Sequence, residues 1–521
     1  MSRIKKSFIY FILSGDVMKK RCFKLFVLLQ VVVCAITMIS CNNNSSGLNK
    51  YSEESLLKKL DPLFRQKGFF TDDKTTLDLL DQCVADMQAY VINTKSNYKV
   101  NKGSTVYYFS ENGADSNDGL TPQTAKKTLV ELEYDVTLQP GDVVLFERGS
   151  TFRGTVKART GVTYSAYGEG AKPIICASKQ DYASSDLWEE TEHENVYVCT
   201  KKINNAGNIM FNNTHTIGDY EQLLGNMKVS GVDDFKGPEN LEQDLDFYCN
   251  NRLGKLYLYS SAGNPGERFE SIEIAEGGDI ISVSNVKDVL IDNLHLTLGG
   301  SHGVGATNSD NLTVRNCIFN WIGGSILTGT TRYGNAVESY KGSNAFYVYN
   351  NWIYQIYDTG ITTQYSQDPQ NKRNVMKDNE YFNNLIEYCF WSIEYYHKIS
   401  DGVVRITENI YIHDNYCRMG GEGWGRTGAG HMCCLSPSGE TIKNIKIENN
   451  VFDRGHAFLV STYSADASQL TFNGNIYVQE KGSIIARIYN KNYNMNDNAL
   501  AVFTDTVGDK NAHVICVSNN Q

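Results

Sequence analysis

Glu338 and Glu394 have the residue type and spacing of a carboxylate pair that could exchange protons with a bound molecule. Each is the third residue of a short segment, Ala336-Val337-Glu338 and Ser392-Ile393-Glu394. If these segments are strands two layers apart in a stack, with about 4.8 Å per layer, the two residues are roughly 9–10 Å apart. Carboxylates about 6.5–9.5 Å apart suit inverting cleavage of a glycosidic bond, and about 5–5.5 Å suits retaining cleavage. The spacing predicts an acid–base pair near the wide edge of the inverting range.

Asp358 is a third candidate acid. It begins the layer between the two glutamates, in Tyr357-Asp358-Thr359-Gly360, and could pair with either of them at shorter range. The alternative is that Asp358 caps the Asp-Thr-Gly turn, since aspartate side chains commonly bond nearby backbone N–H groups. We predict Glu338, Glu394 and Asp358 as the catalytic set, and both readings of Asp358 stay open.

Aromatic and polar residues around these acids could hold a substrate. Indole faces stack on the apolar faces of sugar rings, and guanidinium groups bind carboxylates with two hydrogen bonds. The predicted substrate-binding residues are Arg332, Trp391, His397, Glu422, Trp424, Arg426 and His431. No two or three histidines share one face at the short spacing of a zinc site, so we expect no metal and no cofactor.

A repeat predicts the elements that must position these residues. Its unit is apolar-x-apolar-x-Asn/Asp-x-apolar, with turn positions at residues 293, 316, 350, 384, 414, 449 and 474. Alternating apolar residues point inward, and each asparagine can tolerate a left-handed backbone and bond its counterpart one coil away. A β-sandwich is the alternative, but it would need hairpins with two-residue turns. The steps between turns instead fit a solenoid with loops inserted in some coils.

We therefore predict an all-β fold, a single-stranded right-handed parallel β-helix over residues 105–521. The 44 glycines against 8 prolines fit many tight turns. Residues 41–104 form a polar tether and a small N-terminal helical element, because leucines recur at helical spacing in Leu56–Phe64 and Leu77–Met87. Insertions on both sides of the strands that carry the glutamates predict a groove.

The N-terminus has the pattern of an export signal. Met18-Lys19-Lys20-Arg21 precedes an apolar run that ends in Met38-Ile39-Ser40-Cys41. A basic start and a short apolar core predict a signal peptide over residues 1–40, and the run is short for a transmembrane helix. Cys41 after the cut resembles a lipobox, which implies lipidation of Cys41 and anchoring to a bacterial outer membrane.

The net charge of the chain limits which molecules it is expected to bind. Without residues 1–40 the chain has 42 basic and 58 acidic residues, a net charge of −16. This excludes nucleic acid as an expected partner, because its binding depends on neutralised phosphates. It also disfavours a strongly anionic polysaccharide unless a basic patch or bound calcium intervenes. Ten cysteines remain beyond Cys41 with no CxxC framework, so most are expected to be small buried residues. We expect a monomer.

Several segments together resemble the pectin-lyase-like β-helix superfamily. They are Arg332-Tyr333-Gly334-Asn335-Ala336-Val337-Glu338, Tyr357-Asp358-Thr359-Gly360-Ile361-Thr362 and Trp391-Ser392-Ile393-Glu394-Tyr395. The opening segment Tyr107–Gly119 and the block Gly141–Gly149 are similar to the first coil of secreted bacterial members. The resemblance runs from Thr105 to Val478 and is nearest to the exported fucosidase and xylan-acting branches. Thr363 stands where such relatives carry histidine.

The resemblance implies an enzyme that acts on a polysaccharide or oligosaccharide, and three functions follow. The first is a glycoside hydrolase that uses the carboxylates named above. The second is a polysaccharide lyase, which needs a cation for the uronate, calcium being possible, and a base such as Arg418, Arg426 or Lys398. The third is a non-catalytic glycan-binding surface lipoprotein.

Overall fold

A computed structural model describes residues 55–60, 74–365, 375–397, 405–435, 440–462 and 470–517. All of the described residues belong to one compact unit, which spans residues 53–521. The predicted signal peptide and the predicted lipidation site Cys41 lie outside the described residues. Within the described ranges, no helix has both the length and the apolar character needed to cross a bilayer.

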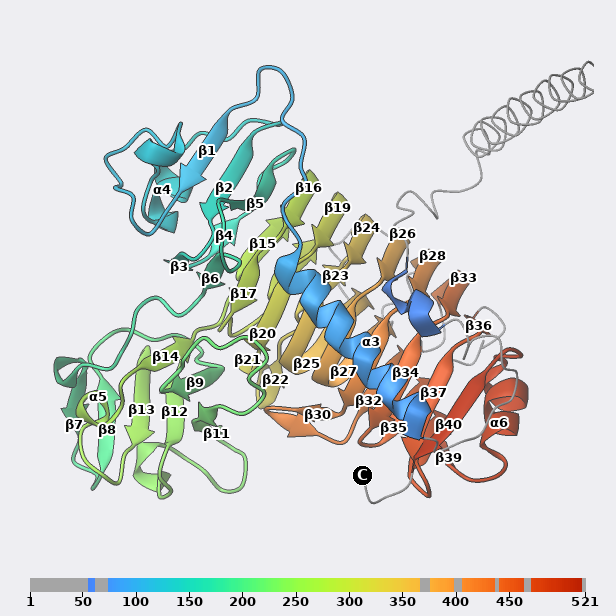
Figure 1. The fold of residues 1–521 in the computed structure, drawn as a ribbon. Helices are drawn as coiled ribbons and strands as arrows, with labels where there is room; N and C mark the ends of the chain where they lie inside the picture. Colours follow the sequence, from blue (N-terminus) through green and yellow to red (C-terminus); the bar gives the residue numbers. More distant parts are fainter. Residues whose placement is uncertain are drawn as a thin grey trace, which may run out of the picture. The chain divides into compact units, whose positions relative to one another are not determined.

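Parallel strands stack into three faces, and successive turns of the chain add one strand to each face (Figure 1). The first face, called face A, contains β1 (Val106–Phe109), β2 (Val143–Glu147), β5 (Thr163–Tyr167), β16 (Lys287–Asp292), β19 (Asp310–Arg315), β24 (Asn344–Tyr349), β26 (Val375–Phe382), β28 (Arg405–His413), β33 (Glu440–Glu448) and β36 (Leu470–Asn473). The predicted first strands of the β-helix, β1 and β2, pair in parallel at the start of this face.

The other two faces share one continuous hydrogen-bonded sheet. Face B contains β3 (Thr151–Arg153), β6 (Ile174–Cys176), β17 (His295–Thr297), β20 (Ile318–Ile322), the first halves of β25 (Trp352–Tyr365) and β27 (Leu385–His397), β29 (Tyr416–Gly420), β34 (Val451–Gly455), β37 (Ile476–Glu480) and β40 (His513–Val517). Face C contains β4 (Val156–Lys157), β15 (Ile281–Ser284), β18 (Val304–Thr307), β23 (Val337–Tyr340), the second halves of β25 and β27, β32 (Gly430–Leu435), β35 (Phe458–Thr462), β38 (Ile484–Ile488) and the antiparallel β39 (Lys491–Asn494). The predicted right-handed parallel β-helix is confirmed.

Apolar side chains fill the interior in columns that run through the coils. On face C one column passes through paired strands and consists of Val304, Val337, Ile361, Ile393, Met432 and Val460. All six belong to one buried core. Because neighbouring residues on a strand point to opposite sides, the residue after each of these faces outward. The core therefore fixes which face C residues can meet a ligand.

Buried asparagines form a ladder at the turn between faces A and B. Asn384 Oδ1 accepts from Asn351 Nδ2 at 2.9 Å, and Asn415 Oδ1 accepts from Asn384 Nδ2 at 2.9 Å. The ladder continues through Asn450 and Asn475 to Asp509. The predicted turn residues 293, 316, 350, 414, 449 and 474 precede this position and have φ between 53° and 70°. The repeat predicted that one residue would provide both the left-handed turn and the ladder amide. In the structure the left-handed residue comes directly before the ladder residue. Of the predicted turn positions, only Asn384 is itself a ladder residue.

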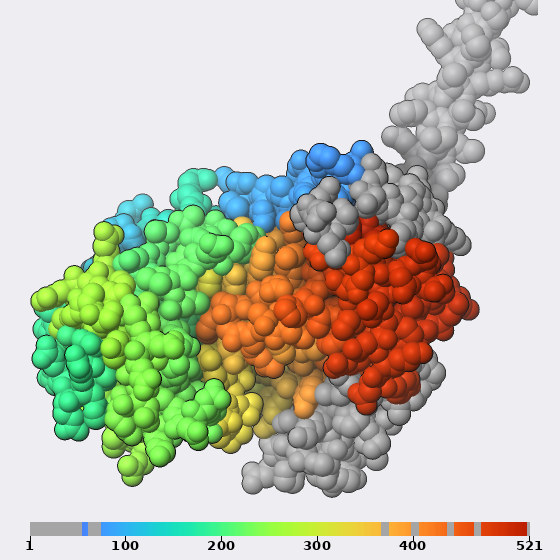
Figure 2. Space-filling model, turned by 90° about the horizontal axis from the view of Figure 1, so that it is seen from below, coloured from blue at the N-terminus to red at the C-terminus, as the bar shows by residue number. Residues whose placement is uncertain are grey.

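An insert interrupts the coil between β6 and β15, which sequence analysis did not foresee. It contains a five-stranded sheet of β7 (Trp188–Glu190), β8 (Val196–Cys199), β11 (Asn226–Lys228), β12 (Asp246–Asn250) and β13 (Lys255–Tyr259), and a three-stranded sheet of β9 (Asn208–Phe211), β10 (Leu223–Leu224) and β14 (Ile272–Ala275). The insert has its own apolar core, which includes Leu187, Phe247 and Leu258. Figure 2 shows the insert, in green, beside the yellow and orange coils.

Helices cover one face and the start of the β-helix. The predicted N-terminal helical element is present as η1 (Leu56–Leu60) and α3 (Lys74–Asn93), whose leucines pack on outward apolar residues of face B such as Trp352. Leu129 and Leu132 of α4 (Leu129–Tyr134) join the main core near β4. The remaining short helices are η2 (Pro122–Thr124), η3 (Ser185–Leu187), η4 (Pro238–Asn240), α5 (Pro265–Arg268), α6 (Ala499–Ala501) and η6 (Val502–Val507).

The ten cysteines beyond Cys41 are all free and buried. This confirms the expectation that most of them act as small core residues. The adjacent Cys433 and Cys434 lie on β32 and, as expected for neighbours on a strand, do not pair with each other.

Candidate functional site

Glu338 and Glu394 stand in one outward column of face C. Glu338 of β23 pairs with Thr362 of β25, which pairs with Glu394 of β27. The two glutamates are therefore in register and two coils apart, as predicted from the repeat. Thr362 Oγ1 donates to Glu394 Oε2 at 3.0 Å. Two residues further along the same strands, Tyr340, Gln364 and Tyr396 form a parallel column beside them.

His302 holds the Glu338 carboxylate. Its Nε2 lies 2.9 Å from Glu338 Oε2, and its Nδ1 accepts the backbone N–H of Asn335 at 3.1 Å. With Nδ1 acting as an acceptor, Nε2 carries the proton and donates to Glu338. Burial lowers the pKa of His302, but Glu338, with help from Asp279 and Asp358, outweighs it and raises the pKa to about 9. A proton on Nδ1 would break the hydrogen bond from Asn335 N–H. This hydrogen bond therefore favours the neutral ring, whereas the nearby carboxylates favour the protonated ring.

Asp279 is a further carboxylate next to the outward column of Glu338 and Glu394, which we call the acidic floor. It comes from the loop before β15, and its carboxylate fills the space above Gly305, the residue paired with Glu338. A Cβ added at Gly305 would lie 2.3 Å from Asp279 Oδ2. Burial raises the pKa of Asp279, and Glu338 adds to this effect while His302 opposes it. Glycine at position 305 is thus what lets Asp279 lie next to Glu338.

Asp358 lies near the same carboxylates, and its side chain pairs with the guanidinium of Arg426. Arg426 Nη1 lies 3.4 Å from Asp358 Oδ1, and the Arg426 guanidinium stacks on Phe390 at 3.5 Å from the ring centre. Burial raises the pKa of Asp358, against the attraction of Arg426 and His302. The Asp358 side chain thus pairs with Arg426, while its backbone N–H donates to Gly334 O.

Glu394 holds its proton more tightly than an ordinary glutamate. Burial is the main cause, repulsion from Asp358 and Glu338 adds to it, and together they raise the pKa of Glu394 to about 8. Thr362 and Arg426 pull in the opposite direction without cancelling the shift. A carboxyl group that is neutral at pH 7 can donate a proton, which is the property required of a general acid.

Two loops flank this floor. The hairpin of β30 (Glu422–Gly423) and β31 (Arg426–Thr427) contacts β25 and β27, and it brings Arg426 to Asp358. The hairpin of β21 (Ser325–Thr328) and β22 (Thr331–Tyr333) lies before β23. Tyr333 packs edge-on against His302, with 5.2 Å between ring centres.

Not all predicted binding residues line the floor. Arg332 donates through Nε to Gly324 O at 2.7 Å and through Nη2 to Gly207 O at 2.9 Å, so it ties the β21–β22 hairpin to the insert. Trp424 packs on Tyr357 and on the apolar cluster at the insert. Both residues therefore hold the walls in place.

The remaining predicted residues divide further. Trp391 is half-buried and stacks on Phe458, with ring centres 6.2 Å apart. Glu422, on the β30–β31 hairpin, has its Oε1 atom 2.6 Å from Nδ1 of His456. The side chain of His397 lies outside the described residues.

His431 corrects an expectation. It is fully buried, with Nδ1 on Ser392 Oγ at 2.9 Å and Nε2 on Asp453 O at 3.1 Å. Burial lowers the pKa of His431 to about 4. Both ring nitrogens are engaged inside the coil, so this histidine does not meet a substrate in the groove.

Sequence reasoning missed Asp279, His302 and the column of Tyr340 and Tyr396. The tyrosines were detectable, because each lies two residues after a predicted glutamate on the same strand face. His302 is just before the segment Gly303-Val304-Gly305, which aligns with the glutamate segments. Asp279 lies outside the repeat and gave no such signal.

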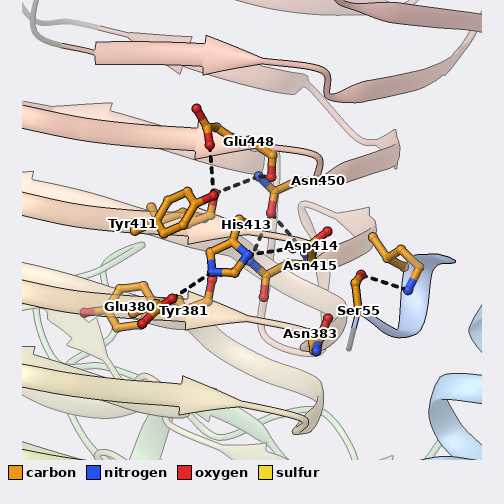
Figure 3. A network of polar contacts seen from close by, with 12 residues as sticks. Ser55, Glu380, Tyr381, Asn383, Tyr411, His413, Asp414, Asn415, Glu448 and Asn450 are labelled. Atoms are coloured by element: carbon orange, nitrogen blue, oxygen red, sulfur yellow. Dashed lines mark hydrogen bonds and ion pairs between the residues drawn. The ribbon is translucent and has the colours of Figure 1, made fainter. Parts of the chain in front are cut away.

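A second acidic cluster lies on face A (Figure 3). His413 Nε2 contacts Glu380 Oε1 at 3.0 Å, and its Nδ1 contacts Asp414 Oδ2 at 2.6 Å. Tyr411 donates to Glu448 Oε2 at 2.9 Å and stacks on His413. Among the described residues of the chain, no group of three or more His, Cys, Asp or Glu is arranged to hold a metal ion.

No family model and no curated protein matches the chain. Solved structures with partial likeness include XylC in complex with xylose (11% identity, 80% of this chain and 86% of that chain, TM-score 0.38). The GH136 lacto-N-biosidase from Eubacterium ramulus (13%, 85% and 69%, 0.36) and the pectate lyase Pel9A (12%, 73% and 70%, 0.34) are others. These likenesses are too distant to bear on the activity, and the fold rests on the strand pairings of the chain itself.

Proposed function

We propose that this chain is a carbohydrate-active enzyme, and specifically a glycoside hydrolase acting on a plant or other complex polysaccharide. The observation that carries the proposal is the register of Glu338 and Glu394 across Thr362 on an outward face. Two rungs of about 4.8 Å separate them along the stack, at the wide edge of the range for inverting glycosidases.

The environments of the two glutamates support different roles. Glu394, with its pKa of about 8, is the general acid that protonates the leaving oxygen. Glu338, oriented by the Nε2–H of His302, is the base that takes a proton from the attacking water. Asp358, held by Arg426, is the alternative partner of either glutamate, and in a retaining mechanism it would be the nucleophile.

Substrate contacts follow from the surfaces beside this pair. The half-buried Trp391 and the tyrosines at 340 and 396 offer aromatic surface for sugar rings. Arg426 extends from the β30–β31 hairpin to Asp358 and offers a donor to a substrate hydroxyl. We also propose, from the sequence alone, a monomer exported and anchored to the outer membrane through Cys41, without a cofactor.

Release of reducing sugar from a panel of plant cell-wall glycans tests the proposal, with absorbance of unsaturated products read in parallel. Hydrolysis that is lost in both Glu338→Gln and Glu394→Gln supports it. Ultraviolet-absorbing products would indicate a lyase instead, and binding without cleavage would indicate a glycan-binding protein. Full activity in both variants would place the chemistry elsewhere.

A further inference from the structure

A cavity of about 530 Å³ lies at the start of face C, next to the acidic floor. Its lining comes from both the β-helix and the insert and includes Lys157, Lys179, Asn205, Asp279, Ser282 and Tyr333. This volume is within the range of about 300–1,000 Å³ for small-molecule sites. It has room for about one or two sugar rings.

The cavity and the candidate acids share a floor. Lys157 pairs with Ser282, Ser282 with Gly305, and Gly305 with Glu338. The cavity therefore begins on the rungs directly before the catalytic pair. Asp279 belongs to both, because it lines the cavity and fills the space above Gly305 beside Glu338.

The helix α4 stands next to the first strand of face C, where the cavity begins. Val156–Lys157 is the first strand of face C, α4 contacts it, and Lys157 forms an ion pair with Glu133 of α4. A chain lying in the groove would meet this helix about three rungs beyond Glu338, which is roughly 14 Å at 4.8 Å per rung.

One side wall is held rigidly by the insert. Asn205 bonds the backbone of Ile326 in the β21–β22 hairpin through both its amide nitrogen and its oxygen, at 2.9 and 2.8 Å. Ser325 Oγ adds a bond to Asn205 O at 2.9 Å, and Arg332 holds Gly207 O. The wall is thus tied to the strand pair that leads to Glu338.

The charges of the lining favour a neutral sugar. Lys157 is paired with Glu133, and Lys179 is paired with Glu276 at 3.0 Å. Asp279 adds a carboxylate, and Glu338 lies next to it. Both lysines of the lining are therefore already neutralised, so a uronate would enter an acidic pocket without a dedicated counter-ion.

We propose that this cavity binds the neutral, non-reducing terminal sugar of the substrate, so that the enzyme removes sugars from the chain end. The proposal rests on the hydrolase function above. Glu338, the base, lies between the cavity and Glu394, the acid. The ring attacked by water is therefore on the cavity side, and the leaving group lies toward Cys433 and Ser461, the next rungs of face C.

Product analysis on borohydride-reduced xylo-, manno-, gluco- and galacto-oligosaccharides, with oligogalacturonides in parallel, tests this. We expect a mono- or disaccharide from the non-reducing end at the earliest time points, and little loss of viscosity on the matching polymer. Internal cleavage, or release of galacturonate, would overturn the cavity's role while leaving the hydrolase intact. If the whole panel is untouched, the hydrolase proposal itself fails.

A pair of variants on β15 localises the effect. Ser282→Trp fills the cavity floor and should raise KM at least tenfold and abolish inhibition by the released sugar. Ser284→Trp, exposed on the same strand and outside the cavity, should leave both unchanged. Equal behaviour of the two variants, with folding confirmed by circular dichroism, would contradict the assignment.

Discussion

The acidic groups around Glu394 and those around His413 lie on different faces of the same β-helix, faces C and A, and their neighbours differ. In the groove, Glu394 faces Asp358 and Glu338, and burial with this repulsion raises its pKa to about 8. On face A, burial lowers the pKa of His413, but its bonds to Asp414 and Glu380 outweigh burial and raise it. Around His413 the carboxylates surround a histidine, and their bonds raise the pKa of its ring. Carboxylates that face each other retain a proton that chemistry can use.

Removal of the proposed acid should have the largest effect. Glu394→Gln keeps the shape and the Thr362 contact but cannot deliver a proton, so we expect a loss of about 10²–10⁴-fold in kcat/KM. Glu448→Gln, a carboxylate of face A bonded to Tyr411, is the matched control and should keep full activity. Steady-state rates on the best glycan of the panel give the answer, and similar losses in both variants would indicate damage to the fold.

The pH profile should report the same proton. Since the acid form of Glu394 is required and its pKa is about 8, kcat/KM should fall as pH rises through 8, by about 100-fold at two units above the pKa. The raised pKa also costs folding free energy, because the unfolded chain releases this proton from about pH 4.3 upward. A profile of kcat/KM that stays flat to pH 10 would contradict the assignment of Glu394.

The asparagine ladder should matter for stability alone. Asn415→Ala leaves the Asn384 amide and Tyr381 O without their partner, at a cost of about 2–3 kcal/mol for buried unsatisfied groups. Urea unfolding should show this loss while kcat/KM stays within twofold. A large fall in activity with unchanged stability would show that the ladder and the groove are coupled.

Gly305→Ala tests how closely the floor is fitted. The new Cβ would collide with Asp279 and displace it from Glu338, and we expect about a tenfold loss of kcat/KM, or about 1.4 kcal/mol. Gly482→Ala, where an added Cβ meets nothing but the positive φ strains the backbone, is the control for a general glycine effect. Wild-type rates in Gly305→Ala would mean that Asp279 has no part in the reaction.

His413→Gln should give the smallest effect, on stability only. A raised folded pKa means that protonation stabilises the fold below the unfolded value of about 6.5, and that this is lost as pH rises through the folded pKa. We expect the variant to be less stable by about 1 kcal/mol at pH 5.5, with a smaller gap at alkaline pH. A pH-independent gap in thermal or urea unfolding would show that packing against Tyr411 dominates.

The sequence by itself determined the coils, because a repeat of alternating apolar residues can bury its face only against copies of itself. That same alternation determined the register of Glu338 and Glu394, since the period of a strand is two and the core allows one phase. The burial of the cysteines follows from the same pattern.

Only the tertiary structure decided what surrounds the pair. Asp279 and His302 reach Glu338 from segments before their strands, where no periodicity applies, and the insert lies outside the repeat altogether. Two residues predicted to bind substrate have other contacts in the structure for the same reason. Arg332 binds backbone carbonyls of the insert and His431 lies inside the coil, because a side chain's partners depend on the segments packed against it rather than on its own position in the chain.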